Sequence, residues 1–231
     1  MKTIGLLGGM SWESTETYYR LVNEGVKARL GGLHSARLIL YSVDFQEIED
    51  LQRAGDWEGA GNLLGEAARR VEMAGADFLL ICTNTMHRVA AEVERNITIP
   101  LLHIADAAGE AIRERGWERV GLIGTRFTME QDFYRGRLRE RFGLETLIPP
   151  AEDRRRVHDV IFQELCLGRT DPNSRTDFYR IIESMVDEGA EAVILGCTEI
   201  SLLVRSEDTP VALLDTTRIH AEKAVEAALA E

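Results

Sequence analysis

Long apolar runs, positive charge, cysteine and lysine are all scarce among these 231 residues. No apolar run approaches the ~20 residues of a membrane-spanning helix, so we expect no membrane segment. Positive charge is also in deficit, because the net charge at pH 7 is −12. Nucleic acids and anionic membranes both require a positively charged surface, so the charge balance disfavours either of them as a partner.

Cysteine is almost as rare, with one residue each at positions 82, 166 and 197 and no CxxC pair. A disulfide framework or a zinc site would need more cysteines or a closer spacing, so the thiols indicate a reducing compartment. The opening Met-Lys-Thr-Ile runs directly into an apolar stretch and lacks a signal-peptide pattern. We therefore expect a cytoplasmic location.

Lysine is the third scarcity, since only Lys2, Lys27 and Lys223 occur among 27 basic residues. None of them directly follows a predicted strand, where a lysine that forms a Schiff base with a cofactor is usually presented. The pattern therefore disfavours enzymes that depend on pyridoxal phosphate.

What is present is an alternation of short apolar runs with amphipathic stretches of helical spacing. The predicted strands are 3–7, 36–42, 78–82, 101–104, 120–124, 145–148, 192–196 and 211–214. The predicted helices are 14–30, 57–74, 106–115, 129–142, 154–167 and 175–188. Because the strands are continuously apolar rather than alternating, we expect parallel sheets that are covered on both faces. The predicted class is α/β, doubly wound.

An internal repeat divides the chain into two similar halves. Residues 75–85, GADFLLICTNT, return as residues 189–199, GAEAVILGCTE, 114 positions later. The opening segment 2–9 returns as 118–125, 116 positions later. We therefore predict two similar doubly wound parallel-sheet lobes related by pseudo-twofold symmetry, with the active site in the cleft between them. The first lobe is expected to comprise residues 1–99 plus 210–231, and the second residues 100–209.

The loops that follow the strands carry the side chains best suited to hold a small ligand. In a parallel sheet, ligands lie beyond the C-terminal ends of the strands, where loops lead into helices. The loops in that position are 8–11, 83–87, 124–128 and 197–199. Helix N-termini attract anions, and Asn84, Thr85 and Thr198 add amide and hydroxyl groups that suit a carboxylate.

The three cysteines are expected to differ in role. Cys197 follows strand 192–196 at a predicted helix start, where the helix dipole stabilises a thiolate, so we predict that it is the reactive group. Cys166 lies within an apolar helix face and is expected in the core. Cys82 precedes Thr83 in an extended strand, so its side chain points to the opposite face and is expected to be structural.

These motifs resemble those of a known family. Thr83-Asn84-Thr85-Met86-His87 and Gly196-Cys197-Thr198-Glu199, with the opening segment 4–10, resemble the aspartate/glutamate racemase superfamily over nearly the whole chain. Tyr18-Tyr19 in the first helix is most similar to the aspartate racemase branch. The resemblance implies an enzyme without a cofactor, often a homodimer, in which a cysteine from each lobe acts on one face of a small amino acid substrate.

One position departs from the family pattern. Cys197 matches the second-half cysteine, which faces the α-hydrogen of the L-enantiomer, but Thr83 stands where the first-half cysteine is expected. A thiol titrates at about pH 8.5, whereas a threonine hydroxyl is far too basic to ionise at neutral pH. We therefore predict an amino-acid racemase for L-aspartate, L-glutamate or a similar substrate, with Thr83 and Cys197 on opposite faces and a preference for the L-enantiomer.

Further residues are assigned to the substrate. Those predicted to bind it are Met10, Gln52, Asn84, Thr85, Thr198 and Glu199. Glu199 would orient the ammonium group or assist the thiol, and His87 would either tune the site or cap and pack. Gln52, Arg53 and Arg126 are candidates for contacting a distal carboxylate. Aspartate racemases carry a lysine in the helix that corresponds to 161–168, where this chain offers only Glu164 and Cys166.

Alternative assignments remain open. A bulge before Asn84 would make Cys82 the second thiol. A single-cysteine decarboxylase of the arylmalonate type, or a cis-trans isomerase of the maleate type, is another activity of the same superfamily. A protein that binds an amino acid without catalysis is a third possibility, and it would leave the α-hydrogen of its ligand unexchanged.

Overall fold

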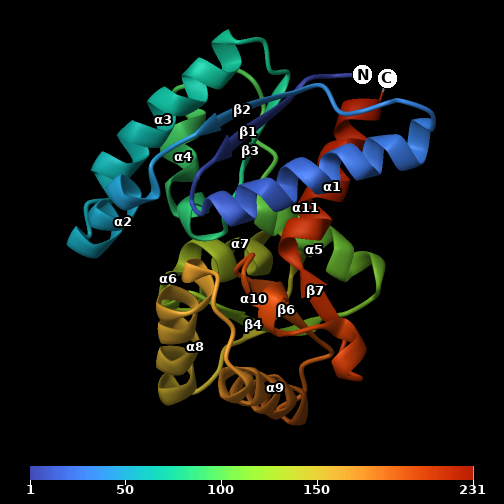
Figure 1. The fold of residues 1–231 in the computed structure, drawn as a ribbon. Helices are drawn as coiled ribbons and strands as arrows, with labels where there is room; N and C mark the ends of the chain where they lie inside the picture. The colour runs from blue at the N-terminus through green and yellow to red at the C-terminus, as the bar shows by residue number, and fades with distance from the viewer. Residues whose placement is uncertain (231) are drawn as a thin grey trace. The chain divides into compact units, whose positions relative to one another are not determined.

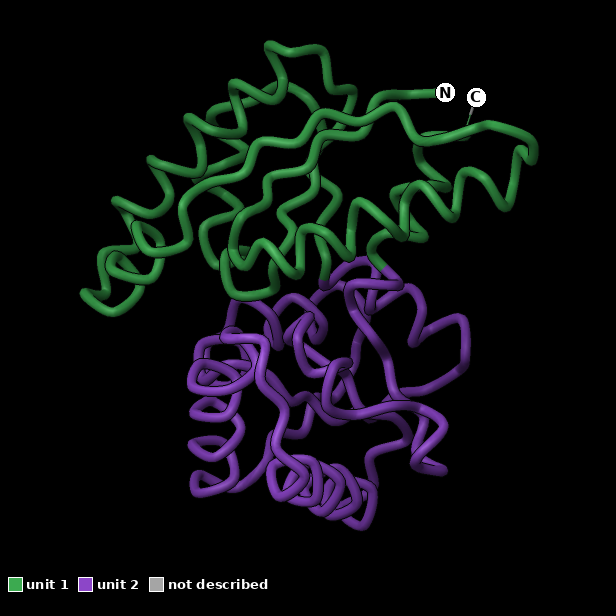
Figure 2. The backbone as a smooth tube through the Cα atoms, in the orientation of Figure 1, with its two compact units in different colours: residues 1–104, 220–231 green, residues 105–219 purple. Residues whose placement is uncertain are grey.

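The computed structural model describes residues 1–230 and divides the chain into two compact units (Figure 2). The first comprises Met1–Ile104 and His220–Glu231, and the second comprises Ala105–Ile219. Each unit is built around one sheet in which all strand pairs are parallel. The predicted α/β class with parallel sheets is therefore confirmed.

The first unit contains a three-stranded sheet of order β2-β1-β3. Its strands are β1 (Ile4–Gly8), β2 (Leu38–Ser42) and β3 (Phe78–Ile81). Its helices are α1 (Trp12–Leu30), α2 (Phe45–Ala54), α3 (Trp57–Met73), the 3₁₀ helix η1 (Thr85–Val89) and α4 (Ala90–Glu94). Helix α11 (Thr216–Leu229) begins in the second unit and ends in the first. Figure 1 shows α1 and α11 on one face of the sheet and α2, α3 and α4 on the other.

Side chains of the first sheet alternate between two apolar clusters. Leu6 and Leu80 pack with α1 and α11, whereas Leu7 and Leu79 pack with α2, α3 and α4. This alternation is the period of an extended strand, and burial on both faces explains why the strands are continuously apolar. Each such side chain contributes about 1.5–3 kcal/mol on burial, so the sheet anchors the loops that leave its C-terminal edge.

The second unit contains a four-stranded sheet of order β5-β4-β6-β7. Its strands are β4 (Arg119–Gly124), β5 (Glu145–Leu147), β6 (Ala192–Gly196) and β7 (Leu213–Asp215). Its helices are α5 (Ile104–Glu114), α6 (Arg126–Glu130), α7 (Asp132–Phe142), α8 (Ala151–Gln163), α9 (Pro172–Asp187) and α10 (Ile200–Leu203), with the 3₁₀ helices η2 (Leu165–Leu167) and η3 (Ser206–Asp208). Helices α8 and α9 pack on β4, and α5 packs so closely on α7 that a Cβ at Gly109 would lie 2.4 Å from the Phe142 ring.

The internal repeat is visible in the strand order. β1, β2 and β3 occupy the positions that β4, β5 and β6 hold in the second sheet. Leu101 adds a single parallel bridge to Leu79 of β3, in the place where β7 pairs with β6. The strand predicted at 101–104 is therefore wrong in extent, because α5 already begins at Ile104.

Other differences from the predicted elements have local causes. The helix predicted at 129–142 is interrupted, because Gln131 adopts an extended conformation between α6 and α7. The helix predicted at 154–167 ends at Gln163, where Glu164 leaves the helical region and η2 follows. Residues 210–219, which the repeat assigned to the first lobe, carry β7 and so hydrogen-bond to the second sheet. None of the helices within residues 1–230 has both the length and the apolar character needed to cross a bilayer.

Candidate functional site

In the first unit, the loop from β1 to α1 is held by a set of short hydrogen bonds. Gly9 has φ +94°, and a Cβ there would lie 2.2 Å from the carbonyl oxygen of Val43, so only glycine fits. Its N–H donates to Thr15 Oγ1 at 2.8 Å, and Thr15 Oγ1 donates to the Ser11 carbonyl at 2.8 Å. Ser14 Oγ donates at 3.0 Å to the carbonyl of Cys82, which ties the start of α1 to the end of β3.

The side chain of Cys82 lies in the apolar core. It is fully buried in the cluster that contains Leu6, Tyr18 and Leu80, on the face covered by α1 and α11. Burial raises the pKa of its thiol, because a thiolate would lose its hydration there. The thiol therefore stays protonated at neutral pH and packs as an apolar side chain.

Thr83 is the first residue beyond Cys82 and is only partly buried. Its carbonyl oxygen lies 2.8 Å from Nδ1 of His87, which is one turn further along in η1. The other ring nitrogen, Nε2, accepts the N–H of Ile104 at 3.2 Å. His87 is therefore a positioned side chain that touches the backbone of Thr83.

Among the predicted substrate-binding residues of the first unit, Asn84 and Thr85 are buried at the start of η1. Gln52 is buried at the end of α2, and its Nε2 lies 2.9 Å from Sδ of Met86, which places it beside η1. Met10 packs in the same apolar cluster as Met86. The structure thus gathers these residues around η1.

Arg53, offered as a candidate for a distal carboxylate, is in a different environment. Its side chain is exposed and pairs with Asp50 and with Glu49 on α2 itself. This arrangement is that of a solvated helix surface.

The corresponding segment of the second unit follows β6. Cys197 and Thr198 are half-buried, and Glu199 is 5% exposed. The Cys197 thiol donates to Glu199 Oε2 at 3.0 Å, and Thr198 Oγ1 donates to the same oxygen at 2.6 Å. The thiol therefore hydrogen-bonds to a carboxylate that is nearly excluded from water.

The pKa of Cys197 is raised well above its ordinary value, whereas the sequence led us to expect a stabilised thiolate. The first cause is burial, and the negative charge of Glu199 and the proximity of Cys166 add to it. Helix α10 has only four residues, from Ile200 to Leu203, so its dipole is short. The resting site therefore holds a protonated thiol beside a carboxylate.

Cys166 was expected in the core of a helix, but it lies in η2 and is partly exposed. Its influence on the pKa of Cys197 places the two thiols near each other. Glu164, the other polar group of that segment, accepts from Ser174 Oγ at 2.9 Å and approaches Arg156 at 3.9 Å. The repeat did not predict that Cys166 lies near Cys197, because no cysteine stands at a matching position in the first half.

Arg126 is exposed at the start of α6. Its guanidinium carbon lies 5.7 Å from the centre of the Phe127 ring, and its backbone N–H donates to His158 Nδ1 at 3.3 Å. Arg126 is not among the groups that shift the pKa of Cys197. The pKa of His158 is lowered by burial and then by the charge of Arg126.

Two residues beside His87 were missed by sequence reasoning. His103 and His220 are buried, and their rings lie 4.4 and 5.9 Å from that of His87. No periodicity or motif connects these positions, because His103 precedes α5, His220 lies on α11, and only tertiary packing brings their rings to His87.

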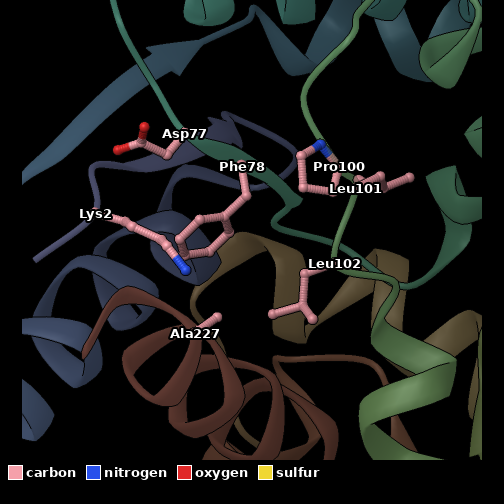
Figure 3. A pocket seen from close by; sticks show the side chains of 7 residues that line it. All are labelled: Lys2, Asp77, Phe78, Pro100, Leu101, Leu102 and Ala227. Carbon is pink, nitrogen blue, oxygen red and sulfur yellow. The ribbon is translucent and has the colours of Figure 1, made fainter. Parts of the chain in front are cut away.

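A cavity of about 320 Å³ lies elsewhere in the first unit (Figure 3). The residues that line it are Lys2, Asp77, Phe78, Pro100, Leu101, Leu102 and Ala227. Asp77 accepts the N–H of Thr3 at 2.6 Å, and Figure 3 shows its carboxylate turned away from the Phe78 ring. None of the predicted site residues lines this cavity.

Comparison with known proteins gives a consistent match. The model of the Asp/Glu/Hydantoin racemase family matches residues 7–224. A broad specificity amino-acid racemase, RacX of Bacillus subtilis (strain 168), is 22% identical over 237 residues, and the match covers 98% of each chain.

Two solved structures are more similar in sequence. A candidate Asp/Glu racemase from Yersinia pestis is 53% identical with a TM-score of 0.93, and all of both chains is covered. An aspartate racemase homologue from Pyrococcus horikoshii OT3 is 37% identical with a TM-score of 0.84, and 99% of each chain is covered.

Proposed function

Because the chain belongs to the Asp/Glu/Hydantoin racemase family and is an amino-acid racemase, we propose that Cys197 and Thr83 act on opposite faces of the substrate's α-carbon. The family match confirms the resemblance that the strand-end motifs indicated. The enzyme is an isomerase that works without pyridoxal phosphate. The observation that carries the proposal is the thiol of Cys197 paired with the buried carboxylate of Glu199.

Glu199 provides the means of activating Cys197. The carboxylate accepts the thiol hydrogen at 3.0 Å, so it can take that proton as the thiolate forms. An amino acid brings a positive ammonium group, and a nearby positive charge lowers the pKa of a thiol. Substrate binding would thus offset the burial that keeps the resting thiol protonated. Thr198 holds the same carboxylate oxygen in place.

The proton transfers balance over one turnover. The Cys197 thiolate takes the α-proton of the L-enantiomer and becomes a thiol, and the Thr83 hydroxyl then gives a proton to the opposite face of the carbanion. Glu199 is left protonated and Thr83 is left as an alkoxide. Solvent returns the extra proton from Glu199 to Thr83, which restores the resting state.

The difference between a thiol and a hydroxyl predicts an asymmetric enzyme. Thr83 can act as an acid toward a strong carbanion, but it is a poor base because its hydroxyl has a much higher pKa than a thiol. The two enantiomers have equal free energies in solution, so kcat/KM of complete racemisation must be equal in both directions. The asymmetry therefore appears as α-proton exchange of the L-enantiomer without inversion.

We propose L-aspartate, L-glutamate or a similar amino acid as the substrate. The names of the relatives support this class, as do the amide and hydroxyl groups of Asn84, Thr85 and Thr198. Gln52, beside η1, is the group best placed in the first unit to contact a side-chain carboxylate. Met10 would contribute to the wall of the same region.

The proposal is tested by incubating the enzyme in deuterated water with each enantiomer of a panel of amino acids. Mass spectrometry follows deuterium at the α-carbon, and chiral chromatography follows inversion. We expect the L-enantiomer to gain deuterium faster than it inverts, and Cys197→Ser to abolish both processes. Thr83→Cys is expected to speed inversion by about 10-fold or more, because it supplies a second thiol of suitable pKa.

Cys82→Ala is the matched control, since it removes the neighbouring thiol and leaves Thr83 in place. We expect it to lower stability through the lost core contacts but to retain exchange and inversion. If folded Cys82→Ala lost inversion while Thr83→Ala retained it, the proton donor on that face would be Cys82 and not Thr83. Ligand binding with no α-proton exchange from any amino acid would contradict the catalytic proposal altogether.

A further inference from the structure

Three of the five histidines of the chain gather in one buried cluster of the first unit. The rings of His87 and His103 lie 4.4 Å apart, and that of His220 lies 5.9 Å from His87. They come from η1, from the segment between α4 and α5, and from α11. Buried imidazoles need hydrogen-bond partners, so their ring nitrogens define how the cluster is protonated.

The hydrogen bonds fix the protonation of two of the rings. Nε2 of His87 accepts the N–H of Ile104 and therefore carries no proton, so Nδ1 carries one and donates it to the Thr83 carbonyl. Nε2 of His220 faces the Leu102 carbonyl at 2.8 Å and must donate to it. Because burial lowers the pKa of this ring to about 4, Nδ1 carries no proton at neutral pH and accepts the Tyr18 hydroxyl at 2.8 Å. Both histidines are neutral, with opposite tautomers.

The position of His87 favours this neutral form. Ile104 is the first residue of α5, and the N–H groups at a helix start have no partner within the helix. Nε2 of His87 satisfies one of them, and the positive end of the helix dipole opposes a second proton on the ring. His87 thus connects the N-terminus of α5 to the backbone of Thr83.

We propose that His87 is a positioning residue for the racemisation, which through its Nδ1–H bond to the Thr83 carbonyl sets the direction of the Thr83 hydroxyl. The rings of His103 and His220 lie next to that of His87. This inference rests on the proposed function, because Thr83 is assigned there as the proton donor. His87 itself need not touch the substrate, and it acts only on the half-reaction that Thr83 performs.

Two substitutions separate the two hydrogen bonds of His87. The amide nitrogen of asparagine reaches the place of Nδ1, so His87→Asn keeps a donor for the Thr83 carbonyl and loses the partner of Ile104. Glutamine extends to the place of Nε2, so His87→Gln keeps a partner for Ile104 and loses the donor. Both variants are compared with the wild type for deuterium exchange into the L-enantiomer and for formation of the D-enantiomer.

We expect His87→Gln to lower the ratio of D-product to exchanged L-substrate about 10-fold, and His87→Asn to keep it near the wild-type value. A structural role alone would lower exchange and inversion together, so an unchanged ratio in folded His87→Gln would overturn the proposal. Absence of exchange in the wild type would instead refute the proposed function.

Nuclear magnetic resonance of the wild-type protein gives a test without any substitution. Two-bond proton–nitrogen correlations of labelled imidazoles distinguish the tautomers. We expect the Nδ1–H form for His87 and the Nε2–H form for His220 at neutral pH. A charged ring or an Nε2–H tautomer at His87 would overturn the proposal, whatever the racemase activity proves to be.

Discussion

His220 should make the stability of the protein depend on pH in a defined window. Its side chain extends from α11 and is fully buried against Tyr18 of α1, and burial lowers its pKa to about 4, with a smaller opposing effect from the Leu102 carbonyl. In the unfolded chain its pKa would return to about 6.5. Between these two values the unfolded state binds a proton that the folded state does not.

The sign and size of the effect follow from this linkage. Because the folded pKa is depressed, the stabilisation is fully present above about pH 6.5 and is lost as the pH falls toward 4. Each pH unit within the window changes the free energy of unfolding by about 1.4 kcal/mol. Lowering the pH from about 7 to about 5 should therefore remove about 2 kcal/mol through this one residue.

The assay is urea unfolding of the wild type and of His220→Gln at several pH values. Glutamine can still donate to the Leu102 carbonyl but does not titrate, so the difference between the two curves isolates the imidazole. The stability advantage of the wild type should shrink by about 2 kcal/mol on acidification. Parallel curves across this range would show that His220 is charged or hydrated in the folded state, and the reasoning would fail.

Two further predictions concern the loops at the strand ends. Glu199→Gln should lower the pKa of Cys197, because it removes a negative charge, yet should slow racemisation by about 100-fold through loss of the proton acceptor. The pH dependence of Cys197 alkylation, followed by peptide mass spectrometry, measures the first effect, and a chiral assay measures the second. Slower alkylation of the variant would contradict the assignment. Gly9→Ala should lower the free energy of unfolding by roughly 1–3 kcal/mol more than Gly31→Ala, as measured by urea unfolding. Both glycines have positive φ, but only at Gly9 would the added Cβ meet Val43. Equal losses of stability would show that the loop moves without cost.

The sequence predicted the strands that carry the site because their signals are local. β3 and β6 lie within a residue of their predicted limits, and each is a continuous apolar run followed by polar residues. The alternation of an extended strand also placed Cys82 on the side opposite to that of its successor. A repeat within one chain strengthens such signals, since each copy supports the assignment of the other.

The protonation of the site could not be predicted in this way. The pKa of Cys197 depends on the Glu199 carboxylate turning back onto the sulfur and on the shortness of α10, which no spacing reveals. His220 meets Tyr18 across 202 positions of the chain, and α11 was not among the predicted helices. Contacts of that kind are set by tertiary packing rather than by local pattern.

Helix α11 has a consequence for the order in which the protein is completed during synthesis. Ala221, Ala224 and Val225 fill the apolar cluster that also contains Ile4 and Leu6 of β1. These last residues leave the ribosome only after the entire second unit has been made. The N-terminal half therefore emerges first but must wait with one sheet face uncovered, so a chain truncated after residue 219 should leave that apolar face exposed and bind chaperones through it.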